Sequence, residues 1–88
     1  MKRIWKVQLS INEQPQVKLL PKEATFLSAQ TQREIPTLWF LVDPEQGVET
    51  WTFSVVGTGR LSLESEVVFL GTCQAFGGQL VWHVFRLV

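Results

Sequence analysis

The 88-residue sequence predicts an all-β fold, a small antiparallel β-sandwich or open barrel. Runs with the alternation of β-strands occur at about seven places along the chain, and no stretch shows the periodicity of a helix. The connections between runs are too short for a helical crossover, so neighbouring strands should pair antiparallel. This length suits one domain, which we expect to cover residues 1–88.

The first three predicted strands are short, and prolines limit the second and the third. Residues 3–9 alternate between apolar and polar side chains. Residues 16–20 stop at Pro21, and residues 25–32 end in polar side chains before Pro36. Proline has no N–H to donate to a neighbouring strand, so both prolines indicate strand limits.

The next two predicted strands differ in how they should be covered. Residues 38–42 are apolar on both faces, which is typical of a central strand with a layer on each side. Residues 49–56 alternate, with Trp51, Phe53 and Val55 on one face and hydroxyl side chains on the other. This second pattern predicts a strand with one face towards solvent.

The loop between these two strands, residues 43–47, carries the chemistry of a tight turn. Asp43 suits the first position, Pro44 the second and Gly47 the exit, so we expect a hairpin loop. A later stretch, residues 60–66, has no strand pattern, and either a longer loop or a single helical turn fits it.

The last two predicted strands, residues 67–76 and 79–88, form a hairpin around Gly77 and Gly78, which can both adopt positive φ. A two-residue turn fixes the register of the strands. The expected cross-strand partners are Phe76 with Gln79, Ala75 with Leu80, Cys73 with Trp82, Thr72 with His83, Gly71 with Val84, and Leu70 with Phe85.

Both faces of this hairpin are largely apolar. Leu70, Thr72, His83 and Phe85 should share one face, and Phe69 should lie on the other face. A short two-layer domain covers one such face with its own core and has little left for the second. We therefore expect a homo-oligomer, most simply a dimer.

Thr72 and His83 place a hydroxyl opposite an imidazole among Leu, Val and Phe side chains. A buried imidazole needs partners for both ring nitrogens, and a threonine can supply one of them. Two interpretations stay open: a core histidine satisfied by Thr72, or a pair that faces a ligand in a shallow apolar pocket.

The stretch of residues 57–60, Gly-Thr-Gly-Arg, also has two interpretations. Its glycines allow backbone conformations in which successive amides bind an anion, and Arg60 adds a charged fork suited to phosphate or carboxylate. The same pattern is typical of a strand that ends in a tight turn. The case for a site improves only if Thr58, Arg60 and His83 converge in space. One or more of Trp39, Trp51 and Trp82 should offer an apolar or stacking surface. The candidate ligand-binding residues are Gly57, Thr58, Gly59, Arg60, Thr72, His83 and Trp39.

The residue counts argue against several chemistries. One His, one Cys and one Asp cannot build the common zinc sites, and residues 57–60 lack the length and the Lys of a P-loop. A triad of Ser54 or Ser62 with His83 and Asp43 is combinatorially possible, but no nucleophile elbow surrounds either serine. We expect a protein that is not an enzyme and that uses no cofactor or metal.

Charge and cysteine content limit which partners and which cellular compartment we expect. Eight basic residues balance eight acidic ones, so DNA, RNA and anionic membranes are not expected as partners. The single cysteine, Cys73, excludes an intrachain disulfide, and the N-terminus has no apolar run like that of a signal peptide. We expect a cytoplasmic protein.

An ordered set of short motifs resembles a family of short phage and prophage proteins of unknown function. The resemblance covers nearly the whole chain from Trp5 onward, and it implies a phage gene product in the cytoplasm of a bacterial host. Arg60 stands where the resemblance leads us to expect His in many members. The motifs are Leu38-Trp39, Leu41-Val42-Asp43-Pro44, Gly57-Thr58-Gly59, Leu70-Gly71-Thr72, Gly77-Gly78, Leu80-Val81 and His83-Val84-Phe85.

Two classes of function follow from these observations. The first is a non-enzymatic small binding protein that sequesters an anionic, nucleotide-like signal of host defence. The alternative is a phage structural or protein-interaction module that meets a phage or host protein through the apolar face of the last hairpin.

Overall fold

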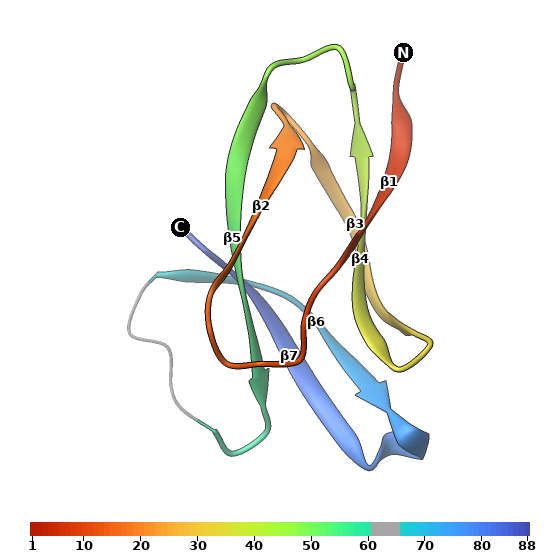
Figure 1. The fold of residues 1–88 in the computed structure, drawn as a ribbon, viewed down its shortest axis with the longest axis vertical. Helices are drawn as coiled ribbons and strands as arrows, with labels where there is room; N and C mark the ends of the chain where they lie inside the picture. Colours follow the sequence, from red (N-terminus) through yellow and green to blue (C-terminus); the bar gives the residue numbers. More distant parts are fainter. Residues whose placement is uncertain (61–65) are drawn as a thin grey trace.

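The computed structural model describes residues 1–60 and 66–88, which form two antiparallel sheets that pack face to face (Figure 1). The three-stranded sheet has the order β1-β4-β3, and the four-stranded sheet has the order β2-β5-β7-β6. The predicted all-β sandwich is confirmed. The strands are β1 (Arg3–Gln8), β2 (Gln16–Pro21), β3 (Thr25–Gln32), β4 (Ile35–Val42), β5 (Val48–Gly57), β6 (Val67–Ala75) and β7 (Leu80–Leu87).

All seven strand predictions are confirmed, and their ends shift by at most three residues. The largest shift is at β4, which begins at Ile35 and includes Pro36 near its start, where a strand tolerates proline. Residues 61–65, which make up most of the predicted longer loop, lie outside the described residues. No helix in the part of the chain that the structure describes is long and apolar enough to cross a membrane.

The expected hairpin at residues 43–47 is wrong, although its turn is present. The Gln46 amide donates to the Asp43 carbonyl at 3.0 Å, and the Glu45 amide donates to Asp43 Oδ1 at 3.1 Å. The turn nevertheless leads from β4 in one sheet to β5 in the other. Because β1 and β3 already occupy both edges of β4, β5 cannot pair with it. The turn residues reverse the chain but do not choose the next partner strand.

The core lies between the two sheets and contains an aromatic cluster. Phe40 of β4 meets Trp51 of β5 at 5.1 Å between ring centroids and Phe53 of β5 at 6.2 Å. Edge-on and tilted contacts of this kind stabilise a core beyond the area that they bury. The buried apolar side chains of this core are Leu9, Leu20, Leu38, Phe40, Val42, Trp51, Phe53, Val55, Cys73 and Val84.

The expected cover on both faces of residues 38–42 is only partly present. Leu38, Phe40 and Val42 are buried in the core, whereas Trp39 and Leu41, on the outer face of the sheet, are half-buried. The reason is that a two-layer sandwich places a second sheet on only one side of β4. The solvent-facing pattern of β5 also has an exception, because Ser54 is buried.

The turn and most of the register of the last hairpin are confirmed. Gly77 and Gly78 have φ values of 68° and 89°, and the Gln79 amide donates to the Phe76 carbonyl at 3.2 Å. The pairing runs as expected from Ala75 opposite Leu80 to Gly71 opposite Val84. Thr72 therefore lies opposite His83.

The expected pairing of Leu70 with Phe85 is wrong, because β6 has a bulge between Phe69 and Gly71. The bulge inserts one residue, so Phe69 becomes the partner of Phe85 and shares its outer face, with ring centroids 5.5 Å apart. Leu70 instead packs against the core. Next to the bulge, a Cβ at Gly71 would lie 2.8 Å from the Ala29 Cβ, so glycine allows β3 and β6 to approach.

Candidate functional site

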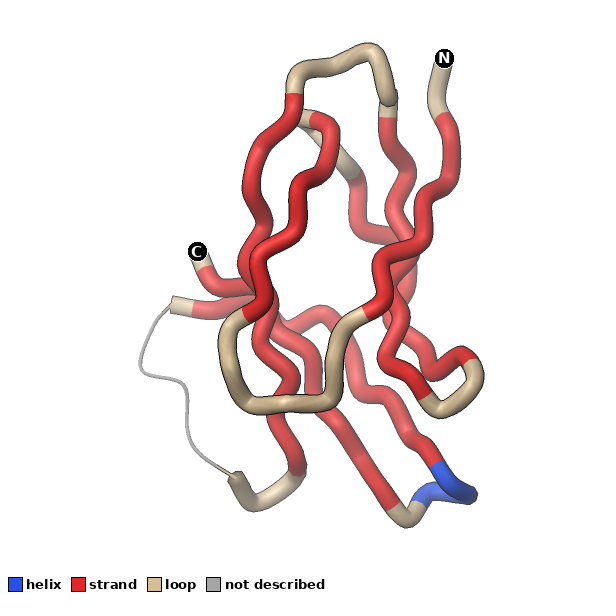
Figure 2. The backbone as a smooth tube through the Cα atoms, viewed as in Figure 1, coloured by secondary structure: helices blue, strands red, loops and turns tan. Residues whose placement is uncertain are grey.

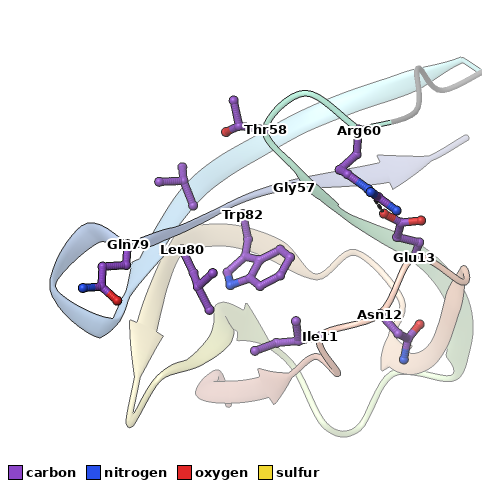
Figure 3. A pocket seen from close by; sticks show the side chains of 10 residues that line it. Ile11, Asn12, Glu13, Gly57, Thr58, Arg60, Gln79, Leu80 and Trp82 are labelled. Atoms are coloured by element: carbon purple, nitrogen blue, oxygen red, sulfur yellow. Dashed lines mark hydrogen bonds and ion pairs between the residues drawn. The ribbon is translucent and has the colours of Figure 1, made fainter.

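A cavity of about 590 Å³ lies at one end of the sandwich, where three segments meet (Figure 3). The first segment is the β1–β2 loop, which passes from one sheet to the other (Figure 2). The second is the end of β5 with the turn that follows it, and the third is the start of β7. The lining residues are Ile11, Asn12, Glu13, Gly57, Thr58, Arg60, Gln79, Leu80, Val81 and Trp82.

The apolar part of the cavity is built around Trp82. Its indole ring lies between Gly57 and Ile11 in the close-up view, with Leu80 beside it (Figure 3). A Cβ at Gly57 would lie 3.2 Å from Arg60 Cγ and 3.5 Å from the Trp82 ring, so glycine lets these two side chains pack closely. The Trp82 Nε1 atom is buried and has no hydrogen-bond partner among the described residues. The cavity thus offers a flat apolar surface.

The polar part of the cavity is an ion pair. Arg60 Nε donates to Glu13 Oε1 at 2.6 Å (Figure 3). The hydrogen bond from Arg60 lowers the pKa of Glu13, and the same bond raises the pKa of Arg60. Both side chains keep access to solvent, with 63% of Arg60 and 38% of Glu13 exposed. These are the charged groups among the described lining residues, so the lining carries no net charge.

The β1–β2 loop that carries Glu13 is shaped by its own hydrogen bonds. The Ser10 amide donates to Gln16 Oε1 at 2.8 Å, and Gln16 Nε2 donates to the Ser10 carbonyl at 2.7 Å. The Gln14 amide donates to Asn12 Oδ1 at 2.9 Å, an arrangement typical of an Asx turn. These contacts close the base of the loop and hold Glu13 towards Arg60.

Residues 57–60 form a tight turn. The Arg60 amide donates to the Gly57 carbonyl at 3.1 Å, and Gly59 has a φ of 81°, which favours glycine at this position. The stretch is therefore a tight turn at the end of β5, as one of the two interpretations expects. Because the Arg60 amide is used inside the turn, an anion at this place would depend on side chains more than on a series of free amides.

His83 is held between two threonine hydroxyls. Its Nδ1 atom lies 3.1 Å from Thr72 Oγ1, which confirms the expected pair, and its Nε2 atom lies 2.7 Å from Thr58 Oγ1. The ring is half-buried on the outer face of the four-stranded sheet, so the interpretation of a core histidine is wrong. His83 instead ties the turn after β5 to β6.

The structure brings most of the candidate residues together. Gly57, Thr58 and Arg60 line the cavity, and Gly59 completes their turn. Thr72 and His83 lie on the reverse side of the sheet and do not line the cavity, and His83 contacts Thr58 from there. Trp39 is not part of this group. It borders a separate shallow hollow on the three-stranded sheet, together with Ile4 and Leu27.

Sequence reasoning missed Glu13 and Ile11, and it named Trp82 only as one of three tryptophans that could offer a stacking surface. Glu13 lies 47 positions from Arg60, and no local pattern relates two loops that far apart. The alternation of side chains along β7 places Trp82 on the inner face of the sheet. Alternation does not reveal that a loop, rather than a strand, lies opposite Trp82.

The combination of Ser54, His83 and Asp43 does not form a triad. Both ring nitrogens of His83 are bound to threonines, Ser54 is buried, and Asp43 lies in the β4–β5 loop. Ser62 lies outside the described residues. Cys73 is in the core, where burial raises the pKa of its thiol, and its strand partner is Trp82 rather than His83.

The fold and the cavity define a small antiparallel sandwich whose two sheets enclose a core and leave a partly open cavity at one end. The chain belongs to the family described as Domain of unknown function (DUF7352), whose sequence model matches residues 1–88. No curated protein and no solved structure matches the chain.

Proposed function

We propose that this protein is a non-enzymatic binding protein that captures a small, anionic, nucleotide-like ligand in the cavity around Trp82 and Arg60. The observation that carries the proposal is the pairing of a flat indole surface with an arginine in one cavity. Its volume of about 590 Å³ falls within the range of roughly 300–1,000 Å³ that is common for small-ligand sites.

The lining suits the two halves of a nucleotide. Any nucleobase can stack on an aromatic side chain, because every base has a flat π-face. Trp82, with Ile11 beside it, offers such a surface. Arg60 presents a planar fork that matches the oxygens of a phosphate.

The charges favour a small ligand over a polymer. Arg60 is the one cation among the described lining residues, and the whole sequence has no net charge. Binding of a nucleic acid depends on many phosphate contacts, which this lining does not supply. A single arginine is enough to bind one phosphate group.

The resemblance to phage and prophage proteins gives the proposal a setting. In the cytoplasm of a bacterial host, a phage protein of this size would act by stoichiometric capture of a nucleotide-like defence signal. Such capture requires binding and no chemical step, which agrees with a cavity lined by few reactive groups.

Titration calorimetry with linear and cyclic mononucleotides tests the proposal. Arg60→Ala should weaken binding by about ten-fold to a hundred-fold, because it removes a charge-assisted hydrogen bond, and should leave the fold intact. Arg3→Ala is the matched control, since it removes the same charge at the start of β1, away from the cavity (Figure 1). Absence of binding for every nucleotide, or equal affinity in wild type and Arg60→Ala, would rule out the proposed site.

A second candidate function is a protein-interaction module that docks through the outer face of the four-stranded sheet. Val17, Leu19 and Phe69 are each more than half exposed on this face, and Phe69 stacks on Phe85. Exposed apolar patches of this kind mark interaction sites, and a second copy of the chain is the simplest partner. Light scattering at tens of micromolar should then show a dimer that Phe69→Glu converts to a folded monomer. A monomeric wild type would contradict this second candidate.

A further inference from the structure

The ion pair between Glu13 and Arg60 joins two segments that are distant in the sequence across the lining of the cavity (Figure 3). Glu13 comes from the β1–β2 loop, and Arg60 follows the turn after β5. The internal hydrogen bonds between Ser10 and Gln16 hold the first loop in shape. In the free protein, the Glu13 carboxylate is therefore already bound to the guanidinium group of Arg60.

We propose that Glu13 is an internal anion that competes with the anionic group of the ligand for Arg60 and thereby sets the affinity of the site. This inference rests on the proposed function. It adds that binding is an exchange at the guanidinium, in which the phosphate of the ligand replaces or approaches the Glu13 carboxylate.

The negative charge of Glu13 disfavours anion binding, whichever nitrogen atoms of Arg60 the phosphate contacts. A phosphate that takes the Nε–H of Arg60 must first displace the carboxylate at 2.6 Å. A phosphate that uses the terminal amino groups of Arg60 must lie beside a second negative charge, and like charges at close range repel. Both routes lower the affinity for anions and leave the affinity for a neutral ring on Trp82 unchanged.

The exchange is easy because the pair is exposed. Ion pairs with access to solvent contribute little to the stability of the fold, so breaking this one does not endanger the sandwich. A phosphate monoester carries more charge and more acceptor oxygens than a carboxylate at neutral pH, and it can therefore win the competition. Anions with less charge, such as free carboxylates, should not displace the Glu13 carboxylate from Arg60.

The test compares adenosine monophosphate with neutral adenosine by titration calorimetry. Glu13→Gln removes the charge and keeps the shape of the side chain, and it should bind adenosine monophosphate about ten-fold more tightly than wild type. Its affinity for adenosine should not change. Glu45→Gln, in the β4–β5 loop at the other end of the sandwich, removes the same charge and should bind both ligands as wild type does (Figure 1).

A double variant shows whether the effect passes through Arg60. In an Arg60→Gln background, Glu13→Gln should gain at most two-fold to three-fold, because the competition no longer exists. Unchanged thermal unfolding confirms that each variant is folded.

The outcomes separate the two proposals. If wild type binds adenosine monophosphate but Glu13→Gln binds it equally or more weakly, Glu13 does not compete and the inference falls, while the proposed function stands. The inference would also fall if Glu13→Gln gained as much affinity for adenosine as for adenosine monophosphate, since the effect would then not depend on the phosphate. If neither protein binds adenosine monophosphate, both the inference and its nucleotide site are wrong.

Discussion

Trp51 and Trp82 lie on the same inner face of the four-stranded sheet, yet their surroundings differ. Trp51 is 7% exposed, its Nε1 donates to Glu49 at 3.3 Å, and its ring contacts Phe40 on one side. Arg86 covers it, with Cζ 3.5 Å from the ring centroid. Trp82 is half-buried, borders a cavity and has a buried Nε1 with no partner among the described residues.

The difference follows from what lies opposite each ring. Trp51 faces β4, which supplies Phe40 to fill the space between the sheets. Trp82 faces the β1–β2 loop, and a loop held by its own hydrogen bonds leaves room beside Ile11. One sheet face is therefore filled by core side chains at one end and borders a cavity at the other. The two ends can be tested separately.

The largest expected effect is on stability at the filled end. Phe53→Ala should lower the free energy of unfolding by about 3–5 kcal/mol, because it empties a fully buried site in the aromatic cluster. Trp82→Ala should cost less than half as much, since part of its ring already borders open space. Urea unfolding measures both. Equal losses would mean that the Trp82 end is packed as tightly as the core.

A smaller effect is expected where β3 and β6 approach. Gly71→Ala would place a Cβ 2.8 Å from the Ala29 Cβ, so the strands must separate, at a cost of about 1–3 kcal/mol in the free energy of unfolding. Ala29→Gly in the same chain should restore part of that loss, because it removes the atom that clashes. Ligand affinity at the cavity should stay unchanged. If the second substitution gave no recovery, the close approach would not be the reason for glycine here.

The local parts of the fold could be predicted from the sequence. Alternation located the strands, and the two glycines gave the register from Ala75 to Gly71. The bulge at Leu70 could not be predicted, because both Phe69 and Leu70 are apolar and either can face the core. The assignment of strands to sheets also depends on which edges are already paired, which is a property of the whole chain and not of residues 43–47.

The candidate site shows the same limit. Thr72 and His83 could be paired because a hairpin register relates them, and Thr58 with Arg60 could be selected by residue type. Glu13 could not, because the contact joins two loops with no pairing between them. Trp39 has the right chemistry for stacking but lies on the other sheet, a placement that alternation within its own strand does not reveal.

The most direct test of the account is a nuclear magnetic resonance titration that compares the indole N–H signals of the four tryptophans while adenosine monophosphate is added. Trp82→Phe and Trp51→Phe variants assign the two signals of interest. We expect the Trp82 signal to shift progressively to saturation while the Trp51 signal stays in place, because the ligand enters the cavity and not the core. A Trp82 signal that does not move, or a Trp51 signal that moves as far, would contradict the claim that this end of the sandwich binds a ligand.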